Sequence, residues 1–339
     1  MKEDVIKGIK STELPDNIKH EVINSLTCRY LIEPRKENIQ IGDSKIGGFP
    51  HLPRDYEYPQ EVDYYYEFVG QLKLSDLYDN EISYLPNTGM LYFFIDDDFN
   101  VGNVNAKVIY LDIEPRNLQI KKPPENKKSR CEAFMDRTET TELKLSISKA
   151  YTIKQELIDN VIDNYIIKEK TSMADFDIEE FFTMDQVWGF TTTWGISEAP
   201  WSAYLTKRRF QSLYYLTTDY KIKYLKEKNI DLTQWVKNEL EGVIAKRKES
   251  LAKYDKTLAI YPYWEQDLVD MEYTKLYIDE FMSNLEYHKS ESKKWSMLLS
   301  LSSYYDAEIK FGDGKMEFFA NSDDLENGNY DDIYCHIYN

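Results

Sequence analysis

Two acidic residues and an amide at alternate positions are the first feature of the sequence that could do chemistry. Asp96, Asp98 and Asn100 have the spacing of the first three ligands of a calcium-binding EF-hand loop. The remainder of such a loop is missing, because Val101 stands where the loop needs glycine and Lys107 stands where it needs glutamate. The flanking residues also resemble strands rather than helices. We therefore predict a solvated turn after a buried strand, and no calcium site.

The histidines do not form a pattern of metal ligands or catalytic groups. His20, His51, His288 and His336 are scattered without ligand spacing, so we predict no metal site. His51 is a candidate binding residue because it lies in a stretch rich in glycine and proline; a hydrogen bond to nearby backbone is the alternative. The motifs of serine hydrolases, zinc peptidases, P-loops and dinucleotide folds are missing, and GDGK at 312–315 precedes a predicted strand instead of a helix. We predict no catalytic residue and no cofactor.

A glutamine and three tryptophans complete the candidates for binding. Gln71 lies in the apolar run FVGQL, and a buried amide must be hydrogen-bonded. Its partner is either the backbone of a neighbouring loop or a small ligand. Trp188, Trp194 and Trp201 stand within fourteen positions. They either line a binding groove, since tryptophan is favoured at binding hot spots, or fill core space.

The stretch KIGGFPHLPRDYEYP, residues 45–59, is predicted to be an ordered strap on the core. Gly47 and Gly48 permit backbone angles closed to other residues, and Pro50 stiffens an extended path. Gly48 and Pro50 are therefore counted among the candidate binding residues. Apolar side chains are available to hold the strap against the core: Phe49, Leu52, Tyr56 and Tyr58.

The elements that must position these residues include two similar β-rich regions. Residues 68–113 contain aromatic and β-branched runs bounded by proline, asparagine and glycine, which is typical of strands and hairpins. Residues 295–338 repeat the same order of elements. In both regions a glycine precedes a pair of phenylalanines at identical spacing: Gly89 with Phe93 and Phe94, and Gly314 with Phe318 and Phe319. We predict an internal duplication into two related halves.

The middle of the chain predicts an inserted helical hairpin at 231–288. Apolar residues recur at helical spacing in two segments separated by YPYW, and Asp231 with Gln234 has the spacing of an N-terminal cap pair. The fold class is α+β, largely antiparallel β, with two related halves and this insertion. The predicted divisions are a β-rich part with the strap at 1–130, a divergent middle at 131–294, and a β unit at 295–339 that completes one domain.

Composition limits the partners that this protein can have. The net charge of −18 makes nucleic acid and anionic membranes poor partners, because phosphate groups must be neutralised by Lys and Arg. The three cysteines, Cys28, Cys131 and Cys335, form no C-x-x-C pair, which fits a reducing compartment. The N-terminus lacks a signal-peptide pattern, and no apolar run is long enough to span a membrane. We expect a cytoplasmic location.

In combination, the segments KIGGFPHLP, FVGQLKLSDL, LPNTGMLYFF and DGKMEFFANSDDL resemble the YwqG-like family of bacterial proteins. The resemblance covers roughly residues 41–113 and 295–338. Tyr58 replaces the tryptophan that is usual in the first signature. Ser300 and Ser302 stand where the family tends to carry glutamine and acidic residues, so part of any shared ligand site would be lost. The resemblance implies a mixed α+β fold with two related halves, and it implies no particular activity.

Two hypotheses for the function remain. The first is a non-enzymatic protein-binding module, for example an immunity protein that neutralises a co-encoded toxin. Its helical hairpin at 231–288 or its tryptophan-rich segment would meet a basic surface of the toxin. The acidic composition and the added helices and tryptophans favour this hypothesis. The alternative is a small-ligand or carbohydrate-binding protein, or an uncharacterised hydrolase, with a cleft between the two halves. Gln71, His51 and Trp194 would supply its polar and stacking groups.

Overall fold

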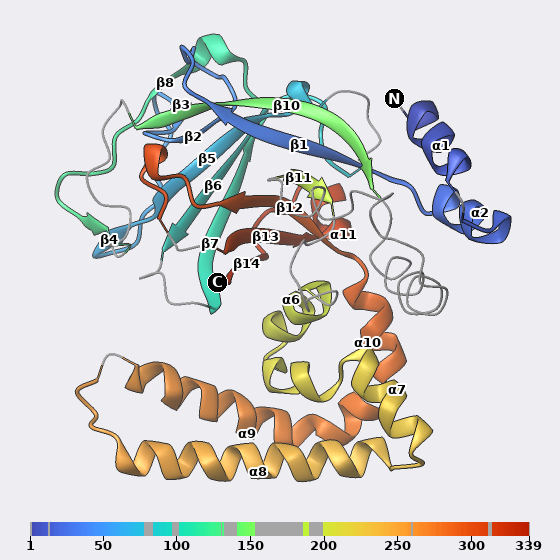
Figure 1. The fold of residues 1–339 in the computed structure, drawn as a ribbon. Helices are drawn as coiled ribbons and strands as arrows, with labels where there is room; N and C mark the ends of the chain where they lie inside the picture. The colour runs from blue at the N-terminus through green and yellow to red at the C-terminus, as the bar shows by residue number, and fades with distance from the viewer. Residues whose placement is uncertain are drawn as a thin grey trace. The chain divides into compact units, whose positions relative to one another are not determined.

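The chain forms two compact units, each built around its own elements (Figure 1). The barrel unit comprises residues 1–197 and 296–339, and the helical unit comprises residues 198–295. The computed structural model describes residues 2–12, 14–77, 84–96, 102–129, 131, 141–152, 186–189, 199–258, 260–310 and 314–338.

The strands fall in the segments that combine aromatic and β-branched residues, as β propensity requires. Their bounds are β1 (Thr27–Arg35), β2 (Lys45–Gly47), β3 (His51–Pro53), β4 (Tyr64–Tyr65), β5 (Glu67–Lys73), β6 (Met90–Asp96), β7 (Gly102–Leu111), β8 (Leu118–Ile120), β9 (Lys128–Ser129), β10 (Glu142–Thr152), β11 (Gln186–Gly189), β12 (Trp295–Ser302), β13 (Lys315–Asn321) and β14 (Ile333–Tyr338).

Helices precede the first strand, form the helical unit and occur once between late strands. Their bounds are α1 (Lys2–Ser11), α2 (Asp16–Asn24), α6 (Ala199–Lys207), α7 (Asp219–Glu227), α8 (Leu232–Lys253), α9 (Tyr261–Ser283), α10 (Leu285–Ser292) and α11 (Ser322–Glu326). The apolar residues of α1 and α2 pack with Tyr151 of β10, so these helices cover one end of that strand.

A closed antiparallel barrel is the main feature of the first unit (Figure 1). Its strands follow the order β1-β10-β2-β5-β6-β7-β14-β13-β12-β11, and β11 pairs back with β1. One side chain in two points inward along each strand, and the inward set forms the principal core. The prediction of an α+β fold with a largely antiparallel sheet is confirmed.

The two similar β regions of the sequence are neighbouring three-stranded meanders within this barrel. β5-β6-β7 and β12-β13-β14 meet where β7 pairs with β14. Phe93 of β6 and Phe318 of β13, which occupy the same place in the two sequence motifs, meet inside the barrel with ring centroids 5.1 Å apart. This placement is compatible with an internal duplication, which nevertheless stays a prediction.

The first three residues of the strap form the barrel strand β2, and residues 48–59 cross the outside of the barrel over β5 and β6. Leu52 and Tyr58 are buried there against Phe68 of β5 and Phe94 of β6. The short strand β3 within the strap pairs with β8, which adds backbone hydrogen bonds to this outer layer. The sheet is thus buried on both faces here, which explains the continuous apolar run of β6.

Gly47, the last residue of β2, cannot be replaced by another residue without strain. Gly47 has φ +72°, and a Cβ added there would lie 2.4 Å from the carbonyl oxygen of Thr141. Gly328 has the same φ of +72°, but nothing lies within 4 Å of its added Cβ. The two positions therefore differ in steric surroundings and not in backbone conformation.

We expect Gly328→Ala to lower the free energy of unfolding by about 1 kcal/mol, which is the usual cost of a left-handed backbone for alanine. Gly47→Ala should cost at least about 2 kcal/mol more, because backbone atoms must move to admit the methyl group. Urea unfolding of the two variants measures this difference. Equal losses would show that the steric contact at Gly47 relaxes at no cost.

A long helical hairpin dominates the helical unit, as predicted for 231–288. The YPYW segment, expected to separate the two helices, instead begins α9, with its proline in the first turn, where a backbone N–H is not needed. The side chain of Asp231 accepts the backbone N–H of Gln234 at 2.7 Å, so the predicted cap of α8 is present. α8 and α9 run antiparallel (Figure 1), and ion pairs link them at regular intervals. These pairs are Lys237–Asp279, Glu241–Lys275, Arg247–Asp267 and Lys248–Glu272.

Candidate functional site

Gln71 fastens the strap to the barrel. Its side chain on β5 is fully buried, and its Oε1 accepts the backbone N–H of His51 at 2.8 Å. Its Nε2 donates to the carbonyl oxygen of Asp43 at 2.9 Å. The hydroxyl of Tyr92 on β6 adds a bond to the carbonyl of His51 at 2.6 Å. The sequence left two possible partners for Gln71, a loop backbone and a small ligand. The hydrogen bonds of Gln71 to His51 and Asp43 are to loop backbone.

The imidazole of His51 is a buried hydrogen-bond acceptor. Its Nδ1 accepts the backbone N–H of Gly42 at 3.0 Å and lies 3.1 Å from Nε2 of Gln71. Because both of these groups can only donate, Nδ1 carries no proton and the ring is neutral. Burial, together with the nearby ammonium of Lys45, lowers the pKa of His51 to about 3, while Asp43 opposes the shift.

Gly48 and Pro50 have structural surroundings in the strap. Gly48 has φ +61°, and a Cβ added there would lie 2.7 Å from the carboxylate of Glu142. The carbonyl of Pro50 accepts the backbone N–H of Lys121 at 2.9 Å. Lys45, fully buried, donates to the same Glu142 carboxylate and to the carbonyl of Phe49 at 2.6 Å. The ion pair of Lys45 with Glu142 and hydrogen bonds to backbone carbonyls thus hold this end of the strap in place.

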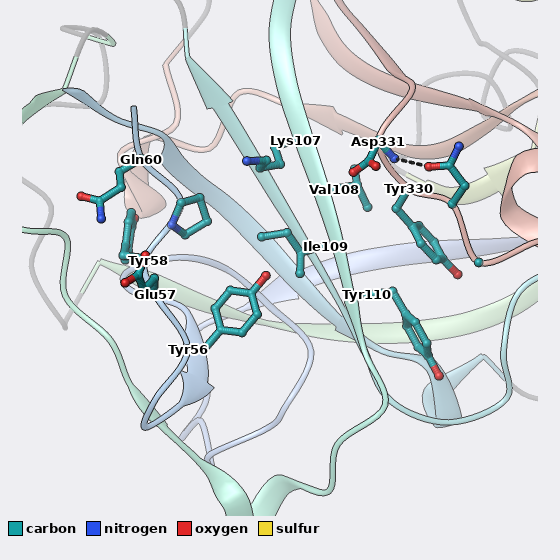
Figure 2. A pocket seen from close by; sticks show the side chains of 13 residues that line it. Tyr56, Glu57, Tyr58, Gln60, Lys107, Val108, Ile109, Tyr110, Tyr330 and Asp331 are labelled. Carbon is teal, nitrogen blue, oxygen red and sulfur yellow. Dashed lines mark hydrogen bonds between the residues drawn. The ribbon is translucent and has the colours of Figure 1, made fainter. Parts of the chain in front are cut away.

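The other end of the strap forms one wall of a groove on the barrel unit (Figure 2). Residues 56–60 make this wall, residues 107–110 of β7 make the floor, and residues 328–331 before β14 make the opposite wall. The groove has a volume of about 600 Å³ and is open to solvent. Figure 2 shows the side chains of the strap wall and of the 328–331 wall on opposite sides of β7. The bonds of Gln71 and His51 therefore position a wall of this groove.

Aromatic rings and carboxylates line the groove. Tyr56 and Tyr58 belong to the strap wall; Tyr110 stacks on Tyr330 across the other side, with centroids 5.5 Å apart and planes at 28°. Burial raises the pKa of Tyr330 to about 12. The hydroxyl of Tyr330 is buried and has no hydrogen-bond partner among the described residues.

The charged side chains of the groove are mainly acidic. Glu57 on the strap wall and Asp331 on the opposite wall are both exposed. Lys107 is the cation of the lining, and its ammonium lies 5.2 Å from the ring centroid of Tyr66. This arrangement can hold a ligand that offers apolar or aromatic surface together with positive charge.

The match to a family of proteins covers nearly the whole chain. A model described as a domain of unknown function, DUF1963, matches residues 44–338. The match begins in the strap and ends in β14, so it contains every residue that lines the groove. The chain belongs to the DUF1963 family. No curated protein matches it. The family description does not name the YwqG-like proteins, so that narrower kinship stays a prediction.

Of the three candidate tryptophans, Trp201 is the one whose side chain the structure describes. Trp201 on α6 is buried in the helical unit, where it stacks on Tyr204 with centroids 5.7 Å apart and donates to the hydroxyl of Thr217 at 3.1 Å. Trp188 lies on β11 of the barrel unit, and its side chain is outside the description. Trp194 lies outside the described residues. Trp201 thus fills core space.

The prediction of a turn at 96–100 falls mostly outside the described residues of the DUF1963 domain. Asp96 ends β6, and its carboxylate accepts a hydrogen bond from the side chain of Asn105 at 3.2 Å. Within the described ranges, no group of three His, Cys, Asp or Glu residues could hold a metal ion. In the same ranges, no helix is both long and apolar enough to cross a membrane.

Sequence reasoning missed the groove of the DUF1963 domain because its walls come from distant segments. Tyr56 and Tyr58 were expected only to hold the strap on the core. Lys107, Tyr330 and Asp331 were not candidates at all. The available signal was the similar composition of DYEYP at 55–59 and NGNYDD at 327–332, where turn residues alternate with tyrosine and acid.

Proposed function

We propose that this chain is a non-enzymatic protein-binding module whose binding surface is the groove over β7. The observation that carries the proposal is an open groove of about 600 Å³ with tyrosines on its walls and carboxylates on both sides. Tyrosine gives large contact area at a low cost in conformational entropy, and it is enriched at protein interfaces. The net charge of −18 would steer a basic partner toward such a surface.

One concrete form of this proposal is an immunity protein that binds a bacterial toxin through a basic surface. Complementary charge raises association rates and excludes partners of the wrong sign, which suits a protein that must neutralise one toxin quickly. The acidic side chains Glu57 and Asp331 would then face lysine or arginine residues of the toxin.

A prediction for binding follows from these two acids. The double variant Glu57→Lys/Asp331→Lys should weaken the complex with a partner co-purified from the native host by at least about tenfold at low salt. Both side chains are exposed, so the fold should be unaffected. The matched control is Glu227→Lys/Glu239→Lys, which makes the same change of net charge at exposed positions of the helical unit.

The comparison of the two double variants separates a local site from general steering. An equal loss of affinity in the two double variants would mean that the net charge of the protein, and not the position of the two acids, determines binding. Binding kept in both would contradict the groove as the binding surface, and failure to recover any partner that depends on the groove would contradict the proposed function.

The alternative of a small-ligand or carbohydrate-binding protein has one observation in its favour. The groove lies where β7 of the first meander separates from β14 of the second, and its volume is within the usual range for ligand pockets. Tyrosine rings could stack on sugar faces. Glycan binding that Tyr56→Ala abolishes and the double acid variant leaves intact would favour this alternative.

A further inference from the structure

β7 has a stretch of backbone that no neighbouring strand pairs with in the described structure. On one side, β6 pairs with it from Asn105 to Leu111. On the other side, β14 pairs only with residues 102–104. Between Ala106 and Tyr110, no described residue bonds to this second edge of the strand. Alternate residues therefore direct their N–H and C=O groups away from the barrel ladder.

The groove follows this edge. Its floor contains Lys107, Val108, Ile109 and Tyr110, which are four consecutive residues of one strand. Successive side chains of a strand point to opposite faces of the sheet. A groove that touches all four residues, beside a stretch of backbone without a strand partner, is the arrangement expected of a groove that follows the edge. Figure 2 shows these side chains leaving β7 in different directions.

Unpaired edges of this kind bind additional strands unless they are covered or charged. Lysine on an edge is one means of protection, but the ammonium of Lys107 lies against the ring of Tyr66. The strap wall and the 328–331 wall flank the edge and leave open space between them. The two walls therefore lie beside the edge without pairing with its backbone, and an incoming segment would fit between them.

We propose that an extended segment of a partner protein adds to β7 as a further strand, with lysine or arginine side chains directed to Glu57 and Asp331. The inference rests on the proposed function and names the mode and chemistry of binding. Strand addition supplies main-chain hydrogen bonds, while pockets for alternate side chains give specificity. One face of the segment meets Tyr56 and Tyr58, and the other meets Tyr110 and Tyr330. The positive charge of the segment is complementary to the two acids and to the acidic chain.

The test uses a labelled seven-residue peptide that alternates lysine with valine and has tyrosine at its centre. Its affinity for the full-length protein is measured by fluorescence anisotropy. Two further peptides carry N-methyl groups on the backbone, one on the odd and one on the even residues. In an added strand only one set of amides faces β7. We expect N-methylation of that set to weaken binding at least about tenfold and N-methylation of the other set to have little effect.

Hydrogen exchange locates the bound peptide. Alternate amides among residues 105–111 should gain protection in the complex, while the amides of α8 should not change. A peptide with glutamate in place of lysine should bind at least about tenfold more weakly, and Glu57→Lys/Asp331→Lys should reverse that preference.

Several outcomes would overturn the inference. Equal effects of the two N-methylated peptides would mean that side chains alone are bound, which leaves protein binding by the groove intact. No binding of any peptide would reject this segment chemistry. Protection of β7 in a dimer of the protein alone would assign the edge to a second copy. If the co-purified partner also ignores the groove variants, the proposed function fails together with the inference.

Discussion

Replacing Glu142 by glutamine is expected to lower the free energy of unfolding by about 3 to 5 kcal/mol. Lys45 is fully buried, and the Glu142 carboxylate is the anion that compensates its ammonium. The carbonyl of Phe49 and the ring of Phe68, 5.5 Å from Nζ, also contact this group, but neither carries a full negative charge. Removal of the anion leaves a charge in a low-dielectric site, which is far more costly than loss of an exposed ion pair.

The double variant Lys45→Met/Glu142→Leu distinguishes the stranded charge from loss of packing. Replacement of a buried ion pair by apolar side chains of similar size is often close to neutral. We therefore expect the double variant to regain most of the stability lost in Glu142→Gln. Lys144→Met serves as the control, because it removes the Lys144–Asp43 ion pair, whose lysine is more exposed than Lys45. Its effect on stability should be much smaller. Urea unfolding measures the free energy of unfolding of these three variants. If Glu142→Gln is as stable as the unmodified protein, Lys45 does not need the Glu142 carboxylate to compensate its charge.

Mild acid is expected to destabilise the protein between pH 6.5 and pH 5 through His51, which is buried, and His336, which is partly buried. Burial lowers the pKa of His51 from 6.5 to about 3 and that of His336 from 6.5 to about 4. The unfolded chain takes up these protons below pH 6.5, whereas the folded protein does not. The stability due to the neutral rings is complete above pH 6.5 and is lost as the pH falls toward the folded values.

The size of the acid effect follows from proton linkage. Each pH unit below 6.5 costs about 1.4 kcal/mol for each histidine held neutral, so the loss at pH 5 is roughly 2 kcal/mol for each ring. His51→Asn keeps an acceptor for the N–H of Gly42 and cannot be protonated, so the dependence on pH should fall by about half. Urea unfolding from pH 7.5 to 5 checks this, and an unaltered slope in His51→Asn would contradict it.

Local sequence pattern was sufficient for two groups of strands and for the helical hairpin. The predicted β segment at 68–113 contains β6, β7 and all but the first residue of β5, and the predicted segment at 295–338 contains β12, β13 and β14. The hairpin of α8 and α9 and the cap at Asp231 were also readable. These features depend on residues within a few positions of one another, where periodicity and turn residues act directly.

The site could be predicted only in part. Gln71 and His51 stood out because a polar side chain in an apolar or glycine-rich stretch needs a partner, and they bond to each other's segment. The buried pair of Lys45 and Glu142 joins residues 97 positions apart in the chain, and nothing in the local pattern relates them. The same holds for Tyr110 and Tyr330, which stack on one side of the groove.

The amino-acid sequence by itself determined the strands of the 68–113 and 295–338 regions, the helical hairpin at 231–288, and the strongly acidic character of the protein. Backbone propensity and side-chain alternation are local properties, so they can be read without knowledge of the fold. Only the tertiary structure decided that the strap becomes a wall of a groove and that β7 keeps an unpaired edge beside it. That edge depends on where β14 stops pairing with β7, because strand pairing joins residues more than two hundred positions apart.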